Sequence, residues 1–160
     1  MKRPLWAPWR IEYILSEKED ECFLCRMFTE PNDRENLVLF RGETCAVIMN
    51  RFPYNSGHLM IAPTRHIAGM EDLTDEESLE MNRLTTRSIK VLSEVMNPEG
   101  FNIGTNLGRA AGAGLEDHLH RHLVPRWVGD TNFMPVMSDT HVVPAALQAT
   151  CDLLADAFRN

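Results

Sequence analysis

The order of apolar and polar residues along the chain predicts several short strands. Apolar runs occupy 37–40, 45–49, 58–62 and 101–105, and each is bounded by turn-forming or polar residues. Short apolar runs limited by Gly, Pro, Asn or Asp are typical of β-strands. The turn at 41–43 separates the first two runs, so we expect these to form a hairpin.

A longer segment, 72–96, has the spacing of an amphipathic helix. Thr74 with Glu77 three residues later matches a capping box, and Asn97 with Gly100 just beyond it closes the run. The side chains expected near one face are mostly apolar: Met81, Leu84, Ser88, Leu92, Val95 and Met96. This face predicts a helix that crosses one face of the sheet.

Histidines alternate with other residues within the segment 117–127, DHLHRHLVPRW. In an extended strand His118, His120 and His122 would leave the same face, whereas on a helix they would diverge. Pro125 is tolerated near the end of a strand but would interrupt a helix. Such alternation is also compatible with a solvent-facing edge strand that picks up metal adventitiously. The sharper interpretation is a nucleophilic or metal-binding cluster, because a neutral imidazole nitrogen is a competent nucleophile near pH 7.

These elements predict a single α+β domain over residues 1–160, with an antiparallel sheet of about five strands and a long crossing helix. A terminal amphipathic helix is expected at 144–158. Residues 1–21 form an aromatic N-terminal arm, which packs either on the domain or on a second subunit.

The charge balance restricts the partners. Lys and Arg number 16 against 23 Asp and Glu, a net charge of −7, which disfavours nucleic acid and anionic membranes as partners. A nucleotide substrate remains compatible, since local amides can hold phosphates. No apolar run approaches a membrane span of about 20 residues, and the first residues lack the apolar stretch of a signal peptide, so we expect a cytoplasmic protein.

Two further segments carry candidate chemistry. Cys22 and Cys25 form a Cys-x-x-Cys pair, which is half of a zinc site, a redox pair or two buried thiols. The segment 106–114 is rich in small residues, and Gly112 and Gly114 would let backbone amides approach an anion close to the histidine segment.

The histidine segment resembles a known family. HLHRHLV at 118–124 matches the His-x-His-x-His-x-x signature of the histidine-triad (HIT) superfamily of nucleotide hydrolases and transferases. VPRWVGDTNF at 124–133, LWAPWR at 5–10 and NRFPYNSGHLM at 50–60 resemble the bacterial diadenosine-tetraphosphate phosphorylase (ATP adenylyltransferase) branch. The resemblance runs over about residues 4–158 and implies a HIT-like fold.

The resemblance also implies roles for individual residues. His120 would attack the α-phosphorus of a nucleotide and form a nucleotidyl-imidazole, while His122 would donate to phosphate or to the leaving group. Asn106 would contact the phosphate, and Asn50 would contact the ribose, unless Asn50 simply opens a turn. Where many members carry a hydroxyl before the triad, this chain has Ala and Gly114, so that contact must come from backbone amides or be absent.

Some members of the superfamily bind structural zinc, which here implies the ligand set Cys22, Cys25, His66 and His118. The family is usually dimeric, so we expect a homodimer. Adenine nucleotides and dinucleoside polyphosphates are the implied substrates. Phosphate as the acceptor makes a phosphorylase that yields ADP and ATP, and water makes a hydrolase that releases AMP from dinucleoside polyphosphates or phosphoramidates. A nucleotide-binding regulatory module with vestigial catalysis is a third possibility.

One residue departs from the family pattern. Arg121 stands where the family usually has a hydrophobic residue between its histidines. We therefore expect the reverse face of this strand to be partly wet, or covered by an acidic partner.

Overall fold

The computed structural model describes residues 22–130 and 147–159. Its centre is a five-stranded sheet with the order β1-β2-β3-β5-β4, and every neighbouring pair of strands is antiparallel. The strands are β1 (Val38–Arg41), β2 (Cys45–Met49), β3 (Leu59–Pro63), β4 (Gly100–Gly104) and β5 (Arg121–Arg126). The expected α+β class and strand number are confirmed.

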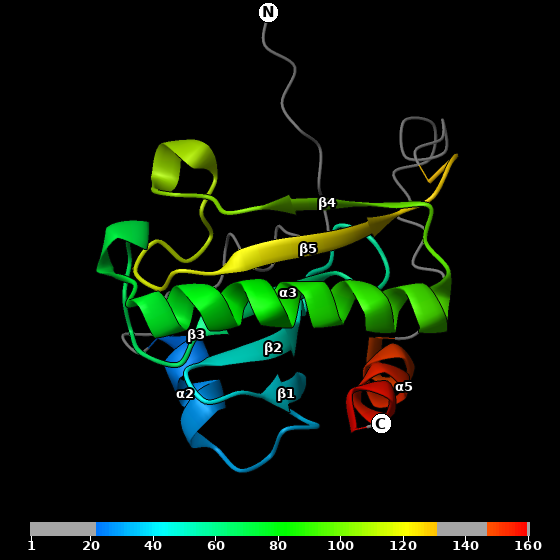
Figure 1. Cartoon of the computed structure of the whole chain (residues 1–160), viewed down its shortest axis with the longest axis horizontal. Helices are drawn as coiled ribbons and strands as arrows, with labels where there is room; N and C mark the ends of the chain where they lie inside the picture. Colours follow the sequence, from blue (N-terminus) through cyan, green and yellow to red (C-terminus); the bar gives the residue numbers. More distant parts are fainter. Residues whose placement is uncertain (1–21, 131–146, 160) are drawn as a thin grey trace, which may run out of the picture.

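Helices accompany the sheet. They are α2 (Phe23–Thr29), α3 (Asp75–Met96) and α5 (Leu147–Arg159), with 3-10 turns η2 (Met70–Asp72) and η3 (Arg109–Ala111). The long α3 crosses one face of the sheet and packs on β2 and β3, and α5 lies against α3 and β1 (Figure 1). Among the described residues, no helix is both long and apolar enough to cross a membrane.

The predicted caps of α3 are confirmed. The Glu77 amide donates to the Thr74 hydroxyl at 3.2 Å, and the Glu77 carboxylate accepts from the Thr74 amide at 2.9 Å. Because Thr74 is extended, the helix begins at Asp75 and not at residue 72, and residues 70–72 form the separate turn η2. Asn97 ends the helix in the left-handed conformation, with φ 48°.

The strand boundaries show what local patterns miss. The first four predicted strands shift by at most one residue. The expected strand at 117–127 was too long, because regular pairing begins only at Arg121. The loop expected at 27–36 begins inside α2, whose Leu24 and Met27 are buried in the core. The N-terminal arm and the predicted helix residues 144–146 lie outside the described residues.

Arg121 lies on the face of the sheet that α3 covers. Its Nη1 donates to Asn82 Oδ1 at 2.9 Å and to Thr85 Oγ1 at 3.2 Å. Both acceptors are neutral α3 side chains, so the acidic partner that we considered for this arginine is wrong for the described residues. The contact ties β5 to α3, which leaves the opposite side of β5 for the histidines on either side of Arg121.

The turn between β2 and β3 passes very close to the end of α3. Gly57 has φ +75°, and a Cβ atom there would lie 2.7 Å from Met96 Sδ and 3.2 Å from Leu92 Cδ2. A side chain would therefore be both strained and overpacked. The glycine lets the chain enter β3 directly above α3 and thereby determines where His58 stands.

Candidate active site and metal-binding cluster

The face of the sheet opposite α3 carries the site. In the antiparallel register Met60 pairs with His122, and Gly104 pairs with His122 from the other side. Directly paired residues share a face, so these side chains form one row across three strands. The rings of His120 and His122 meet nearly at right angles, with centroids 4.8 Å apart.

His120 has the geometry of a nucleophile. Its Nδ1 lies 2.8 Å from the backbone carbonyl oxygen of His118, and only 6% of the residue is exposed. A carbonyl only accepts, so Nδ1 carries the proton and Nε2 keeps its lone pair. Burial lowers the pKa of His120, and the hydrogen bond to His118 opposes that shift only in part. The ring is therefore neutral near pH 7, with a defined tautomer.

His122 is oriented by a second histidine, His58, which sequence reasoning did not select as a site residue. The backbone N–H of Tyr54 donates to His58 Nδ1 at 3.1 Å, and His58 Nε2 lies 3.0 Å from His122 Nδ1. Because His58 Nδ1 accepts, its proton sits on Nε2 and points at His122. In neutral His122 the proton is then on Nε2, so His122 presents an N–H donor while His120 presents a lone pair.

The loop that holds His58 is anchored to the end of β5. Asn55 Nδ2 donates to the Pro125 carbonyl at 3.2 Å and to Asp130 Oδ2 at 2.9 Å. Arg126 pairs with both carboxylate oxygens of Asp130, at 2.6 and 2.8 Å. These contacts keep the Tyr54 amide in place, and with it the proton positions of the two histidines.

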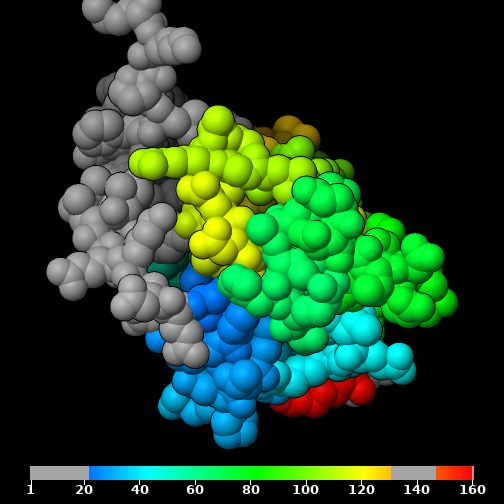
Figure 2. All heavy atoms as spheres, turned by 90° about the vertical axis from the view of Figure 1, so that its left-hand side faces the viewer, coloured from blue at the N-terminus to red at the C-terminus, as the bar shows by residue number. Residues whose placement is uncertain are grey.

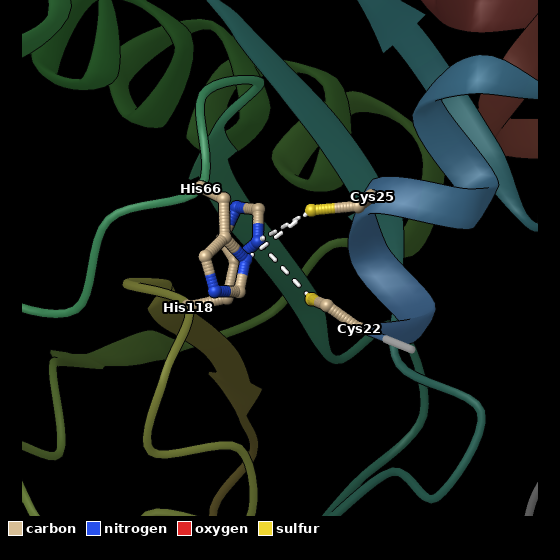
Figure 3. A group of neighbouring side chains, drawn as sticks. All are labelled: Cys22, Cys25, His66 and His118. Atoms are coloured by element: carbon tan, nitrogen blue, oxygen red, sulfur yellow. Dashed lines mark hydrogen bonds between the residues drawn. The ribbon is translucent and has the colours of Figure 1, made fainter. Parts of the chain in front are cut away.

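The ring of His118 lies in a cluster with Cys22, Cys25 and His66 (Figure 3). One ligand atom from each residue lies within 4.8 Å of all the others. His118 Nδ1 is 3.3 Å from Cys22 Sγ and 3.5 Å from Cys25 Sγ, and His66 Nδ1 is 3.3 Å from Cys25 Sγ. His118 therefore contributes its ring to this cluster, whereas the rings of His120 and His122 contact each other.

These distances fit a tetrahedral metal ion. Zn–S bonds of about 2.3 Å and Zn–N bonds of about 2.0–2.1 Å at tetrahedral angles place sulfur and nitrogen about 3.6 Å apart. The three measured S···N separations are within 0.3 Å of that value. His118 Nε2 also lies 2.8 Å from the Pro63 carbonyl, which leaves Nδ1 as the lone pair toward the thiols. The cluster could hold a metal ion, and its members are the four residues that the family resemblance implied.

Three segments far apart in the chain supply the cluster. Figure 2 shows α2 (blue), the segment after β3 (green) and the segment before β5 (yellow) meeting at one end of the molecule. The Leu119 amide donates to the Ile67 carbonyl at 2.6 Å. Next to His66, Arg65 makes two contacts with the Glu77 carboxylate, at 3.0 and 2.8 Å. The His66 loop is therefore tied both to α3 and to the triad segment.

The remaining predicted residues lie in the segments after β2, after β4 and before the histidine segment. Asn106 follows β4 two residues beyond Gly104, on the His120 side of the strand pair. Gly112 has φ +85°, and its amide is used within the loop, donating to Arg109 at 3.0 Å. Gly114 stands between this loop and the histidine segment.

Asn50 Oδ1 accepts from the Phe52 amide at 2.8 Å, which is the turn geometry that we considered as the alternative to a ribose contact.

Comparison with known proteins places these residues in a wider group. A family model described as "HIT domain" matches residues 32–128. A Mycobacterium tuberculosis protein named AP-4-A phosphorylase is 42% identical over 159 residues, which cover 94% of this chain and 82% of that protein. A Dictyostelium discoideum bis(5'-adenosyl)-triphosphatase is 30% identical over 93 residues, covering 58% of this chain and 62% of that protein.

A solved structure shares the fold. It is described as a Zn-bound histidine triad family protein from Mycobacterium smegmatis, with a TM-score of 0.68 and 23% sequence identity. The match covers 86% of this chain and 93% of that one. At this identity the likeness shows the fold alone.

Proposed function

Since this chain belongs to the HIT domain family, we propose that it is a nucleotidyl transferase that cleaves diadenosine tetraphosphate with inorganic phosphate into ADP and ATP. The observation that carries the proposal is the hydrogen bond from His120 Nδ1 to the His118 carbonyl, which frees Nε2 for attack. The branch is supported by the Mycobacterium tuberculosis relative, whose name describes a phosphorylase of this dinucleotide.

The reaction proceeds in two displacements. His120 Nε2 forms a bond to the α-phosphorus, the phosphorus attached to one of the two adenosines. The bond from this phosphorus to the oxygen that bridges it to the β-phosphorus breaks, and the rest of the substrate leaves as ATP. His122 Nε2–H donates a hydrogen bond to the departing oxygen. A phosphate oxygen then attacks the same phosphorus, the N–P bond breaks, and ADP forms with His120 regenerated. Division of one displacement into two is the general advantage of covalent catalysis.

Substrate contacts complete the site. Asn106 and backbone amides of the loop at 106–114 would stabilise the oxygens of the attacked phosphate, and Gly112 and Gly114 let the backbone approach it closely. Asn50 lies on β2's side of the triad, where the ribose would sit. We assign it to the ribose through Nδ2, since Oδ1 already accepts from Phe52.

The acceptor is tested by product analysis. The protein is incubated with diadenosine tetraphosphate, with and without inorganic phosphate, and the nucleotides are separated by ion-exchange chromatography. We expect ADP and ATP only when phosphate is supplied, because the nucleotidyl-histidine then has its acceptor. AMP in both reactions would instead establish the hydrolase, the second candidate, which the Dictyostelium discoideum relative's name favours.

A second prediction concerns His58. Replacement of His58 by alanine removes the donor that holds His122 in its tautomer, and we expect kcat to fall by roughly 10²-fold with a smaller change in KM. Glutamine places an amide N–H near the former Nε2, so His58→Gln should recover part of the loss. The ¹⁵N chemical shifts of the His122 ring report the tautomer directly. If they are unchanged in His58→Ala, the positioning role is wrong even if the activity falls.

We further propose that the Cys22, Cys25, His66 and His118 cluster binds one structural zinc ion. Bound there, zinc would cross-link the three segments and supply no reactive site, because four protein ligands leave no open coordination position. The donor distances support this assignment.

We also propose a homodimer and a cytoplasmic location. Ile103 on the edge strand β4 is 49% exposed, and a second copy could cover this apolar edge. Light scattering that gives a monomer mass at micromolar concentration would exclude the dimer. No disulfide joins any of the four cysteines, all of which are described, and this suits a reducing compartment. Cell fractionation tests the location.

A further inference from the structure

The C-terminal end of α2 is held by an arginine from the sheet. Arg41, the last residue of β1, donates from Nη1 to the Phe28 carbonyl at 2.6 Å. Its Nη2 donates to the carbonyls of Met27 and Glu30, each at 3.0 Å. The last carbonyls of a helix have no partner within the helix, and a positive charge is favourable at that end of the helix dipole. Arg41 therefore caps the end of α2 with its side chain.

The guanidinium of Arg41 is itself fixed in place. Asp33 Oδ1 accepts from Arg41 Nε at 2.9 Å and from Nη2 at 2.6 Å. The backbone of Arg41 pairs with Ala46 in the hairpin of β1 and β2, and every residue of β2 is buried. Only 34% of the Arg41 side chain is exposed. Through this residue the end of α2 is tied to the central sheet.

The part of α2 that Arg41 holds adjoins the metal-binding cluster. Cys22 and Cys25 project from the start of α2 toward the two histidines (Figure 3). Cys25 precedes Phe28 by three residues, so the two lie about one helical turn apart. The Phe28 ring meets the His118 ring edge-on, with centroids 5.9 Å apart. A shift of the Phe28 backbone would thus displace both a thiol and the ring that packs on a histidine ligand.

The short helix α2 depends on contacts of this kind. Seven residues are too few for a stable isolated helix. Burial of Leu24 and Met27 holds α2 against the core, but burial is non-directional and allows a helix to rotate or slide. Hydrogen bonds depend on distance and angle, so three of them to the carbonyls at the helix end fix both its rotation and its height. These bonds therefore determine where the two thiols stand.

We propose that Arg41 is a positioning residue of the metal-binding cluster: it holds α2 so that the two thiols meet His66 and His118 in tetrahedral geometry. The inference rests on the zinc site of the proposed function, and it adds a residue that is not itself a ligand. It is independent of which nucleotide the protein cleaves. Residues that orient metal ligands typically contribute about 10- to 100-fold to metal affinity, which sets the size of the expected effect.

The test measures zinc affinity and requires no turnover. Metal-free protein is titrated with zinc in competition with a chromophoric chelator, and a Co²⁺ titration records the visible absorption of a tetrahedral site. Arg41→Met keeps the hydrocarbon stem and loses the donors, so we expect the zinc Kd to rise by about 10-fold or more. Arg41→Lys keeps the charge without the planar fork and should give an intermediate Kd. If the methionine variant does not fold, the lysine variant decides by the same criterion.

Arg34→Met supplies the matched control. Arg34 also makes two contacts with one carboxylate, that of Asp152, both at 2.9 Å. This pair joins the segment between α2 and β1 to α5, so its loss removes the same chemical group without releasing the carbonyls of α2. We expect the zinc Kd of Arg34→Met to stay within about twofold of wild type, because exposed ion pairs contribute little.

Thermal unfolding separates positioning from a general structural role. If Arg41 positions the thiols, a fixed zinc concentration should raise the melting temperature less in Arg41→Met than in wild type. Equal losses of melting temperature with and without zinc, with an unchanged Kd, would show that Arg41 only stabilises the fold. A rise in Kd of the same size in Arg34→Met would also overturn the proposal.

The same titration distinguishes this inference from the zinc assignment on which it rests. If wild type binds no zinc, the assignment fails and the inference fails with it. If wild type and Arg41→Met bind zinc with equal affinity, only the role of Arg41 is wrong, and the four ligands remain as proposed.

Discussion

His120→Ala is expected to lower kcat for diadenosine tetraphosphate by about 10⁴-fold or more while the protein stays folded. The variant loses the only ring in the triad segment whose tautomer offers an unprotonated Nε2, and no covalent intermediate can form. The ring is buried but lies at the site face, so its removal leaves a cavity and costs some stability without changing the sheet. Steady-state kinetics and circular dichroism together measure both effects.

Arg121 offers the control for this experiment, because it is the next residue and its side chain lies on the opposite face. Arg121→Leu loses the contacts with Asn82 and Thr85 and should lower the melting temperature. We expect its kcat to stay within about threefold of wild type, since the strand still carries both histidines.

Intact-protein mass spectrometry of the denatured wild type should detect one added nucleotidyl group per chain. Activity of His120→Ala close to that of wild type would remove the proposed nucleophile.

The double variant Cys22→Ser, Cys25→Ser is expected to lose its metal and a large part of its stability. We expect elemental analysis to find about one zinc per chain in the wild type and none in the variant. Zinc sites couple binding directly to folding, so the free energy of unfolding should fall by several kcal/mol. The cluster joins residues 93 to 96 positions apart in the chain, so its loss releases α2 from the segment before β5. Denaturant unfolding measures the change.

Cys151→Ala provides the matched control, because this thiol is buried in the core away from the cluster. Burial raises the pKa of Cys151 to about 11, so it remains a thiol and is a poor metal ligand. The variant should keep its zinc and lose only about 1 kcal/mol from the small cavity. A wild type that is metal-free and equally stable with and without chelator would contradict the zinc assignment.

Much of the fold was predictable because its signals are local. The capping box of α3, the turn glycines and the short apolar runs each act over a few residues, so the sequence places them within one or two positions. The helix α2 was missed for the opposite reason. Seven residues are too few for a stable isolated helix, and α2 is held by the burial of Leu24 and Met27 in the core.

The sequence by itself determined the candidate chemistry: two thiols, two further metal ligands and the central histidine, each carried by a motif within a short stretch or by the family resemblance. Only the tertiary structure decided which histidine has which role: metal ligand, nucleophile or proton donor. Ring proton positions depend on hydrogen-bond partners, and the partner of His122 is His58, 64 residues away. His118 belongs to the thiol cluster because α2 folds against it, while Gly104 comes beside His122 only through strand pairing. No local pattern records these contacts, because each is created when distant segments of the chain pack together.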